Sequence, residues 1–245
     1  MAIFLLEKTL KDYIDSCNET EIKIIESEHS FFQIICDMDK FYREELVKGD
    51  FDLCPASHFL AFNSYSLMLS GIKTVLTGHA FAVYPIFRTS LESIIYACYI
   101  NESEELQAIW LDRNKNDSSK KKCRDAFKIQ KMIKEIQSHL PSEHENIGYM
   151  ISESYEASID FGAHPNVRGI VEQLSNGEEY GDHWKFDMTA LYGERDFQVK
   201  RSMLACLEYF FIILYITALL LKKNRDGFIL DILSNFDEQK EEWKN

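Results

Sequence analysis

An arginine and a glutamate stand four residues apart in an otherwise uncharged, apolar stretch, and together they could hold an anion. Arg88 and Glu92 are the only Lys, Arg, Asp or Glu residues between His79 and Asn101. Residues four apart lie on one side of a helix, so the two side chains can pair. A guanidinium offers a planar fork of donors to a carboxylate or phosphate, and Glu92 would orient that fork. The alternative is a structural ion pair that fixes the register of a buried helix.

A histidine further along the chain could complete such a site. His164 lies in the turn DFGAHPN, with Asp160 four residues before it and Arg168 four residues after it. Asp160 could hold the imidazole ring, and Arg168 adds a second cation. Histidine exchanges protons near neutral pH and can act as an acid, a base or a hydrogen-bond donor. We therefore take His164 with Arg88 and Glu92 as candidate catalytic residues, and Arg168 as a candidate ligand-binding residue.

Positive charge is concentrated in one segment, 113–134, of a chain whose net charge is −13. The segment holds nine basic and two acidic residues, a net charge of +7. Basic residues on one face bind a phosphate backbone, so RNA is a candidate partner here, although the chain as a whole repels nucleic acid. The alternative is a solvated helix face. The candidate contacts are Lys120, Lys121, Lys122, Arg124 and Lys128.

The composition predicts one all-α domain over residues 1–245. Apolar residues make up 46% and aromatic residues 13% of the chain, enough for a sizeable core. Only 10 Gly and 4 Pro are present, which disfavours sandwiches and barrels because these need frequent turns. The six cysteines show no CxxC spacing and predict reduced thiols in a cytoplasmic protein. No repeat or low-complexity linker divides the chain.

Two apolar helices, 79–101 and 196–223, are predicted to form the centre of a bundle of about seven to nine helices. HWKFDM, near 180–190, alternates loosely and can form a strand of a short hairpin. The other segments with helical periodicity or capping signals are 3–17, 19–47, 55–77, 103–112, 120–139, 142–161, 226–234 and 236–243.

The segment 203–221 is apolar enough to raise the question of a membrane span. It has 19 residues with Glu208 as its only charge, and a span needs roughly 17–25 residues. A carboxylate costs about 2.5–3.5 kcal/mol at a bilayer centre, so we expect a buried helix and no membrane. Glu208 is then a candidate third member of the ligand site. If Glu208 and Glu92 both face Arg88, one of the two carboxyl groups should have a raised pKa.

Metal and cofactor signatures are missing from the sequence. Glu26-x-x-His29 is a single ExxH, whereas a ferritin-like di-metal site needs two of them and further carboxylates. The sequence contains no GxGxxG, no Walker loop, no GxSxG, no HExxH and no paired Cys/His spacing. We therefore predict no metal and no cofactor.

Two short motifs resemble a group of bacterial all-helical proteins. Arg88-Thr-Ser-Leu-Glu92 is similar to the Arg-Ser-Leu-x-Glu core helix of that group, and His164-Pro165 is similar to its downstream His-Pro turn. The resemblance covers about 60–166. The chain is also distantly similar to HEPN-type helical bundles, many of which are RNA-cleaving toxins or defence proteins. Their signature places a histidine four to six residues after an arginine, and no arginine here has that spacing.

These observations leave three functions open. In the first, a cytoplasmic bacterial protein binds a protein partner or a small anion at a polar pocket, with Arg88 as anchor, Glu92 as orienter and His164 at the rim. In the second, implied by the HEPN resemblance, a metal-independent RNA-cleaving toxin or defence enzyme uses His164 as acid/base and Arg88 to stabilise the phosphorane, while 113–134 holds RNA. The third is a purely structural subunit. All three are compatible with a homo-oligomer.

Overall fold

The computed structural model describes residues 9–48, 52–140, 144–163, 165, 167–181, 183–222 and 228–244. Helices dominate, and one small hairpin is present, so the predicted all-α fold with a short hairpin is confirmed. The helices are α1 (Leu10–Ser27), α2 (His29–Phe41), α3 (Pro55–Leu76), α4 (Val83–Asn101), α5 (Glu104–Leu111), α6 (Asp117–Ala126), α7 (Ile129–His139), α8 (Glu145–Ser158), α9 (Val167–Val171), α10 (Phe197–Leu220) and α11 (Phe228–Lys244). The strands are β1 (Leu174–Tyr180) and β2 (His183–Met188); π-helical turns cover Tyr42–Leu46 and Ile159–Ala163, and a 3-10 turn covers Asp112–Asn114.

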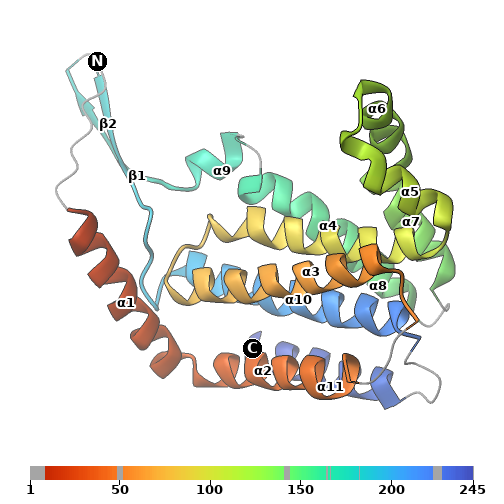
Figure 1. Cartoon of the computed structure of the whole chain (residues 1–245). Coiled ribbons are helices and arrows are strands. Elements are labelled where there is room, and N and C mark those ends of the chain that lie inside the picture. Colours follow the sequence, from red (N-terminus) through yellow and green to blue (C-terminus); the bar gives the residue numbers. More distant parts are fainter. Residues whose placement is uncertain are drawn as a thin grey trace.

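The two predicted apolar helices lie at the centre of the molecule. Helices α3, α4 and α10 pack together, α8 covers α4 and α10, and α2 and α11 form a layer below α10 (Figure 1). Most side chains of α10 from Val199 to Leu220 are buried, and every residue from Tyr209 to Ala218 is. Within the described residues α10 is the one helix long and apolar enough to cross a membrane, and 78% of its most apolar window is buried inside the protein. Its surroundings are those of a core helix.

Small residues let α3 approach α4 closely. A methyl group at Gly71 would lie 2.6 Å from the ring of Phe87, so only a glycine fits there without movement. Ser64 Oγ donates to the carbonyl of Ser90 at 2.8 Å, and Ser90 Oγ donates to the carbonyl of Ser64 at 2.6 Å. These buried contacts fix which side of α4 faces α3. Arg88 and Glu92 consequently lie on another side, toward α8 and the segment that follows α4.

Several predicted helices have different boundaries in the structure. The two short pieces expected at 226–234 and 236–243 are one continuous helix, α11. The expected break near residue 18 lies instead at Glu28. A capping box between Thr9 and Asp12 starts α1, and the helix runs without interruption to Ser27. The expected helix 120–139 is divided into α6 and α7 at Phe127. The ring of Phe127 is buried against α4, and this tertiary contact interrupts the helix.

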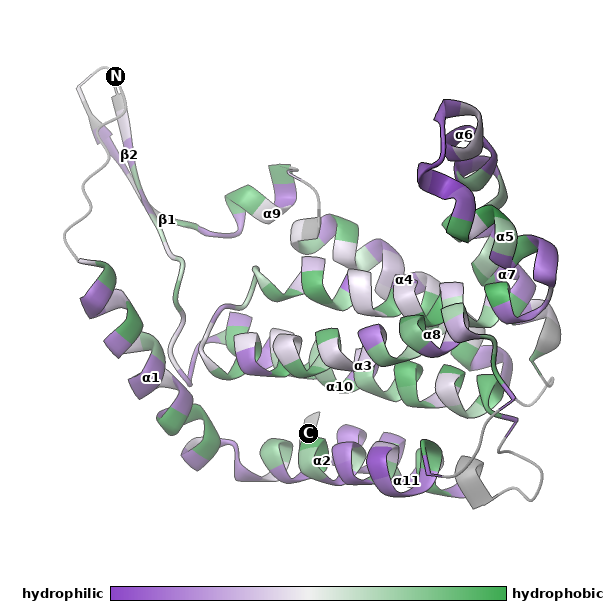
Figure 2. Ribbon diagram, in the orientation of Figure 1, coloured by the Kyte–Doolittle hydropathy of each residue, from purple (hydrophilic) through white to green (hydrophobic). Residues whose placement is uncertain are grey.

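The outer parts of the molecule are polar, as Figure 2 shows for α6, which projects from the apolar body. The side chain of Asn116 caps α6 by accepting from the backbone N–H of Ser119 at 2.8 Å. Helix α5 and the 3-10 turn pack against α6, and α7 packs against α4. The basic segment predicted from the sequence is thus held next to the C-terminal half of α4.

Candidate anion-binding site

Arg88 is held by two side chains inside the protein. Its Nε donates to Glu92 Oε1 at 2.9 Å, and its Nη2 donates to Tyr155 Oη at 2.7 Å. Its guanidinium carbon lies 4.8 Å from the centre of the Tyr155 ring. The side chain of Arg88 is 18% exposed and that of Glu92 is 32% exposed. The predicted pair therefore forms, but Arg88 already has an acceptor on α4 and another on α8.

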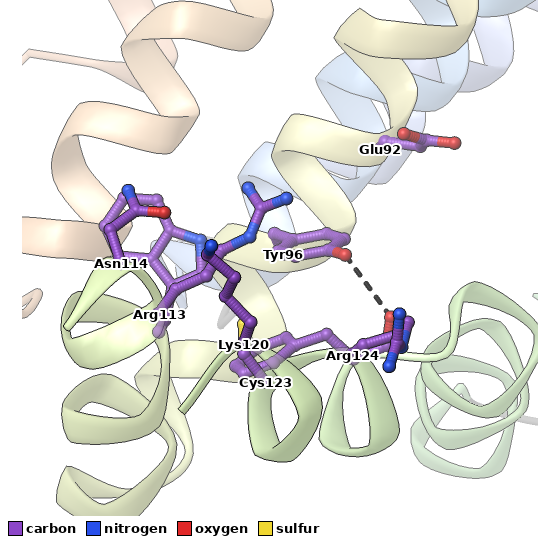
Figure 3. A pocket seen from close by; sticks show the side chains of 9 residues that line it. Glu92, Tyr96, Arg113, Asn114, Lys120, Cys123 and Arg124 are labelled. Atoms are coloured by element: carbon purple, nitrogen blue, oxygen red, sulfur yellow. Dashed lines mark hydrogen bonds between the residues drawn. The ribbon is translucent and has the colours of Figure 1, made fainter. Parts of the chain in front are cut away.

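A cleft of about 490 Å³ opens beside Glu92, between α4, the α5 end, α6 and the Phe127 turn. We call it the basic cleft. Figure 3 shows its lining side chains, among them the cations Arg113, Lys120 and Arg124 and, from α4, Tyr96 and Glu92. Arg88 does not line it. The lining residues are Glu92, Tyr96, Trp110, Arg113, Asn114, Lys120, Cys123, Arg124 and Phe127.

Local structure explains why three cations gather at this cleft. The 3-10 turn after α5 carries Arg113 and Asn114. Lys120 and Arg124 are four residues apart on α6 and therefore share a side of that helix. Lys120 Nζ lies 3.3 Å from a carboxylate oxygen of Asp117, and both side chains are exposed. Among the described residues, Arg113 and Arg124 have neither an ion-pair partner nor a hydrogen-bond acceptor.

Aromatic rings form the apolar floor of the cleft. Phe127 and Tyr96 stack with their ring centres 5.2 Å apart and their planes 15° apart. Tyr96 Oη donates to the carbonyl of Phe127 at 3.3 Å, the dashed line in Figure 3. This hydrogen bond occupies the Tyr96 hydroxyl, so the two stacked rings and half-buried Trp110 present apolar surface to the cleft.

The titratable groups at the floor stay neutral at neutral pH. Burial raises the pKa of Tyr96, and the nearby carboxylate of Glu92 raises it further. Burial also raises the pKa of the Cys123 thiol, and Arg113 offsets only part of this effect. A thiolate nucleophile is therefore disfavoured in the cleft. Its chemistry is that of a binding site with fixed positive charge.

The other residues singled out from the sequence are distributed elsewhere. His164 lies outside the described residues. Asp160, which we expected to hold its ring, accepts from Arg168 Nη1 at 3.1 Å, and its expected contact with His164 lies outside the described residues. Arg168 also donates to Glu172 at 3.2 Å, so this predicted ligand-binding residue is part of an ion-pair network. Glu208 is partly exposed on α10, where its charge acts on Tyr84 and Tyr209.

The predicted nucleic-acid patch is split by the fold. Lys120 and Arg124 line the basic cleft. Lys122 Nζ instead lies 3.6 Å from Glu105 Oε1 on α5. Lys121 and Lys128 are exposed and do not line the cleft.

Sequence reasoning overlooked several residues of the site. Trp110, Asn114 and Cys123 line the cleft, and Tyr155 anchors Arg88. Helical periodicity placed Trp110 on an apolar face, and nothing in the pattern showed that α5 and α6 turn back toward α4. The nine basic residues of 113–134 were the one usable signal, because Arg113 was among them.

Fold and site together define an all-α protein with a protruding hairpin and a basic cleft beside a central helix. No protein-family model matches the chain, and neither a curated protein nor a solved structure is significantly similar to it. A function must therefore be argued from the site itself.

Proposed function

We propose that this protein binds a small phosphate- or carboxylate-bearing molecule in the basic cleft. One observation carries the proposal. Arg113, Lys120 and Arg124 surround one hollow of about 490 Å³ in a chain whose net charge is −13, and within the described residues the two arginines have no counter-ion. Like charges held together repel one another, so an anion placed between them gains an attraction that the folded chain alone does not supply.

The lining suits a small molecule rather than a bare ion. Ligand pockets commonly measure about 300–1,000 Å³ and combine an apolar wall with a few polar groups. The two guanidinium groups can each bind a phosphate or carboxylate with two parallel hydrogen bonds, while Lys120 acts as a point charge. Trp110 and Tyr96 provide the apolar wall for the remainder of the ligand.

Arg88 has an indirect role in this proposal. It was expected to be the anion anchor, yet its donors point to Glu92 and Tyr155. Its function would be to hold the Glu92 carboxylate at the cleft wall, where that group can accept a hydrogen bond from a hydroxyl or amine of the ligand. Arg88 is thus a positioning residue, and Arg113 and Arg124 are the anchors.

Titration calorimetry with inorganic pyrophosphate tests the proposal. A hydrogen bond to a charged group contributes about 1.5–3 kcal/mol, so Arg113→Gln and Arg124→Gln should each raise the Kd by about tenfold or more. Lys121→Gln is the matched control, because it removes a charge from the same helix outside the cleft. The fluorescence of Trp110, in a variant with Trp184 and Trp243 replaced by Phe, should change with the same Kd. Equal losses in Lys121→Gln and Arg124→Gln would count against a specific cleft site.

RNA binding and cleavage is the second candidate function. The observation that favours it is the combination of exposed cations with aromatic rings, which is how single-stranded nucleic acids are often held. In that function His164 would serve as the acid/base, so His164→Ala should abolish cleavage while leaving RNA binding and the unfolding temperature unchanged. Wild-type protein that neither cuts RNA nor arrests growth would end this candidate. Failure of both anions and RNA to bind would leave the role of a structural subunit.

A further inference from the structure

The β1–β2 hairpin carries a row of exposed apolar side chains. Trp184, Phe186 and Met188 are alternate residues of β2, so they share one face, and they are 65%, 52% and 62% exposed. The rings of Trp184 and Phe186 stack with their centres 6.2 Å apart. Phe186 also covers Gly177, where a methyl group would lie 2.9 Å from the ring. Large apolar side chains grouped in this way mark an interaction surface.

The hairpin has little support from the rest of the described chain. In that part of the protein, β1 and β2 pair only with each other, and no helix packs extensively against them. Figure 1 shows the two strands projecting from the helical body. A two-stranded hairpin alone is at best marginally stable in water, and further strands are needed for a stable sheet. An additional strand at one edge would meet this need.

The register of the hairpin shows which backbone groups face the outer edge of β2. The N–H of Thr189 donates to the carbonyl of Gln173 at 3.1 Å, so Thr189 directs its backbone toward β1. The irregularity in the ladder falls between Ser175 and Glu178 of β1, and β2 itself keeps a regular alternation. Backbone groups alternate in direction along a strand. The backbones of the three apolar residues therefore face outward, and those of Lys185 and Asp187 face β1.

We propose that two copies of this chain pair antiparallel through the outer edges of β2, about a two-fold axis at Phe186. Phe186 then lies opposite the partner's Phe186, and Trp184 lies opposite the partner's Met188. In the same register Lys185 lies opposite the partner's Asp187, and symmetry repeats this pair. A two-fold contact requires a surface that complements itself, and the sequence HWKFDM does so in charge as well as in size.

Charge selects this register over its neighbours. Moving the axis one residue back would place Lys185 opposite the partner's Lys185. Moving it one residue forward would place Asp187 opposite the partner's Asp187. Like charges directly opposite destabilise a strand pair, while opposite charges and aromatic pairs stabilise it. Because the hairpins project from the helical bodies, the two acidic bodies stay apart, and salt screens their repulsion beyond about 8 Å at physiological ionic strength.

Sedimentation equilibrium of the full chain at physiological salt tests the pairing. The wild type should be a dimer. Lys185→Asp and Asp187→Lys should each be monomeric, because each places like charges opposite one another twice. An equimolar mixture of these two variants should form a heterodimer, since every facing pair is then of opposite sign, and the double exchange in one chain should restore the homodimer. Lys121→Asp, with the same change of charge on α6, should remain dimeric.

The equimolar mixture of the two single variants distinguishes a contact between chains from a change in the stability of the hairpin within one chain. A structural effect within one chain cannot be repaired by adding a second defective chain, whereas a contact between chains can. Circular dichroism should show unchanged helix content in all variants, because the hairpin makes no extended contact with the described helices. A monomeric wild type, dimeric single variants, or a mixture that stays monomeric would each overturn the proposal. Binding of pyrophosphate at the basic cleft should be the same in every variant.

Discussion

Arginines near the two ends of α4 have opposite surroundings. Near its start, Arg201 Nη1 donates to Glu172 at 2.5 Å, and its guanidinium carbon lies 4.2 Å from the ring centre of Phe161. Arg168 reaches the same ring at 4.6 Å and the same carboxylate at 3.2 Å. Near the other end, Arg124 lines the basic cleft, without a carboxylate partner among the described residues.

The difference shows what the fold does with each positive charge. At the first end, the guanidinium groups of Arg168 and Arg201 share the Glu172 carboxylate and the Phe161 ring, so both positive charges have a partner within the protein. At the second end, Arg113 and Arg124 have no carboxylate partner among the described residues, so a bound anion could neutralise them. Arg88 stands between these cases, because it is paired internally while its partner Glu92 reaches the cleft wall. The following substitutions measure how far the contrast holds.

The largest effect is expected at Arg201. Arg201→Ala removes a partly buried cation from Glu172 and from two aromatic rings, Phe161 and Phe81, the latter 5.2 Å away. Removing one member of a buried pair costs about 3–5 kcal/mol, and the partial exposure of this pair places the expected loss near the lower end. Urea unfolding should show a loss of about 3 kcal/mol. Arg201→Lys keeps the charge but not the planar stacking and should lose less; an unchanged midpoint in Arg201→Ala would contradict a structural role.

A smaller loss is expected at Arg88. Arg88→Ala removes hydrogen bonds to Glu92 and Tyr155 from a side chain that is 18% exposed. Hydrogen bonds to charged groups contribute about 1.5–3 kcal/mol, so we expect a stability loss of about 2 kcal/mol. The Kd for pyrophosphate should rise only a few-fold, because Arg88 acts through Glu92. A Kd that rises a hundredfold with no loss of stability would instead make Arg88 the anchor.

The sequence predicted the helical core more fully than it predicted the site. Apolar periodicity identified the central helices, and the spacing of Arg88 and Glu92 placed both on one side of α4. The break in the helix at Phe127 was not predictable, because it depends on the stacking of the Phe127 ring on Tyr96, which is distant in the sequence. The return of the chain toward α4 at this point also forms the cleft, and it places Lys120 and Arg124 in the cleft lining while Lys121 and Lys122 lie outside it. Local patterns carry no information about such contacts, and tertiary packing decides them.

The ionisation of Glu172 tests whether the arginines near the start of α4 are used to stabilise the protein. Burial alone would raise the pKa of Glu172, but hydrogen bonds from Arg201 and Arg168 outweigh it and hold the pKa below its ordinary value of 4.5. A carboxyl group with a lowered pKa in the folded state stabilises the protein above its ordinary pKa, and this contribution is lost as pH falls through the folded value. The unfolding temperature of the wild type should therefore exceed that of Glu172→Gln at pH 6, and the gap should narrow below about pH 4.5. If the difference in unfolding temperature stayed constant down to pH 3, the contribution of Glu172 to stability would not depend on its charge.

The smallest effect on stability is expected in the basic cleft. Arg124→Gln removes an exposed cation that has no counter-ion in the described chain and lies near Arg113 and Lys120. Surface substitutions away from special features usually change stability by less than about 0.5 kcal/mol, and relief of repulsion between like charges acts in the stabilising direction. Urea unfolding without ligand should therefore show no loss, while the same variant loses pyrophosphate affinity. At the same pyrophosphate concentration, the urea midpoint should rise more for the wild type than for Arg124→Gln. A ligand stabilises the folded state more when its Kd is lower. If Arg124→Gln destabilised the free protein as much as Arg201→Ala does, the cleft arginines would be structural too, and the contrast between the two ends of α4 would disappear.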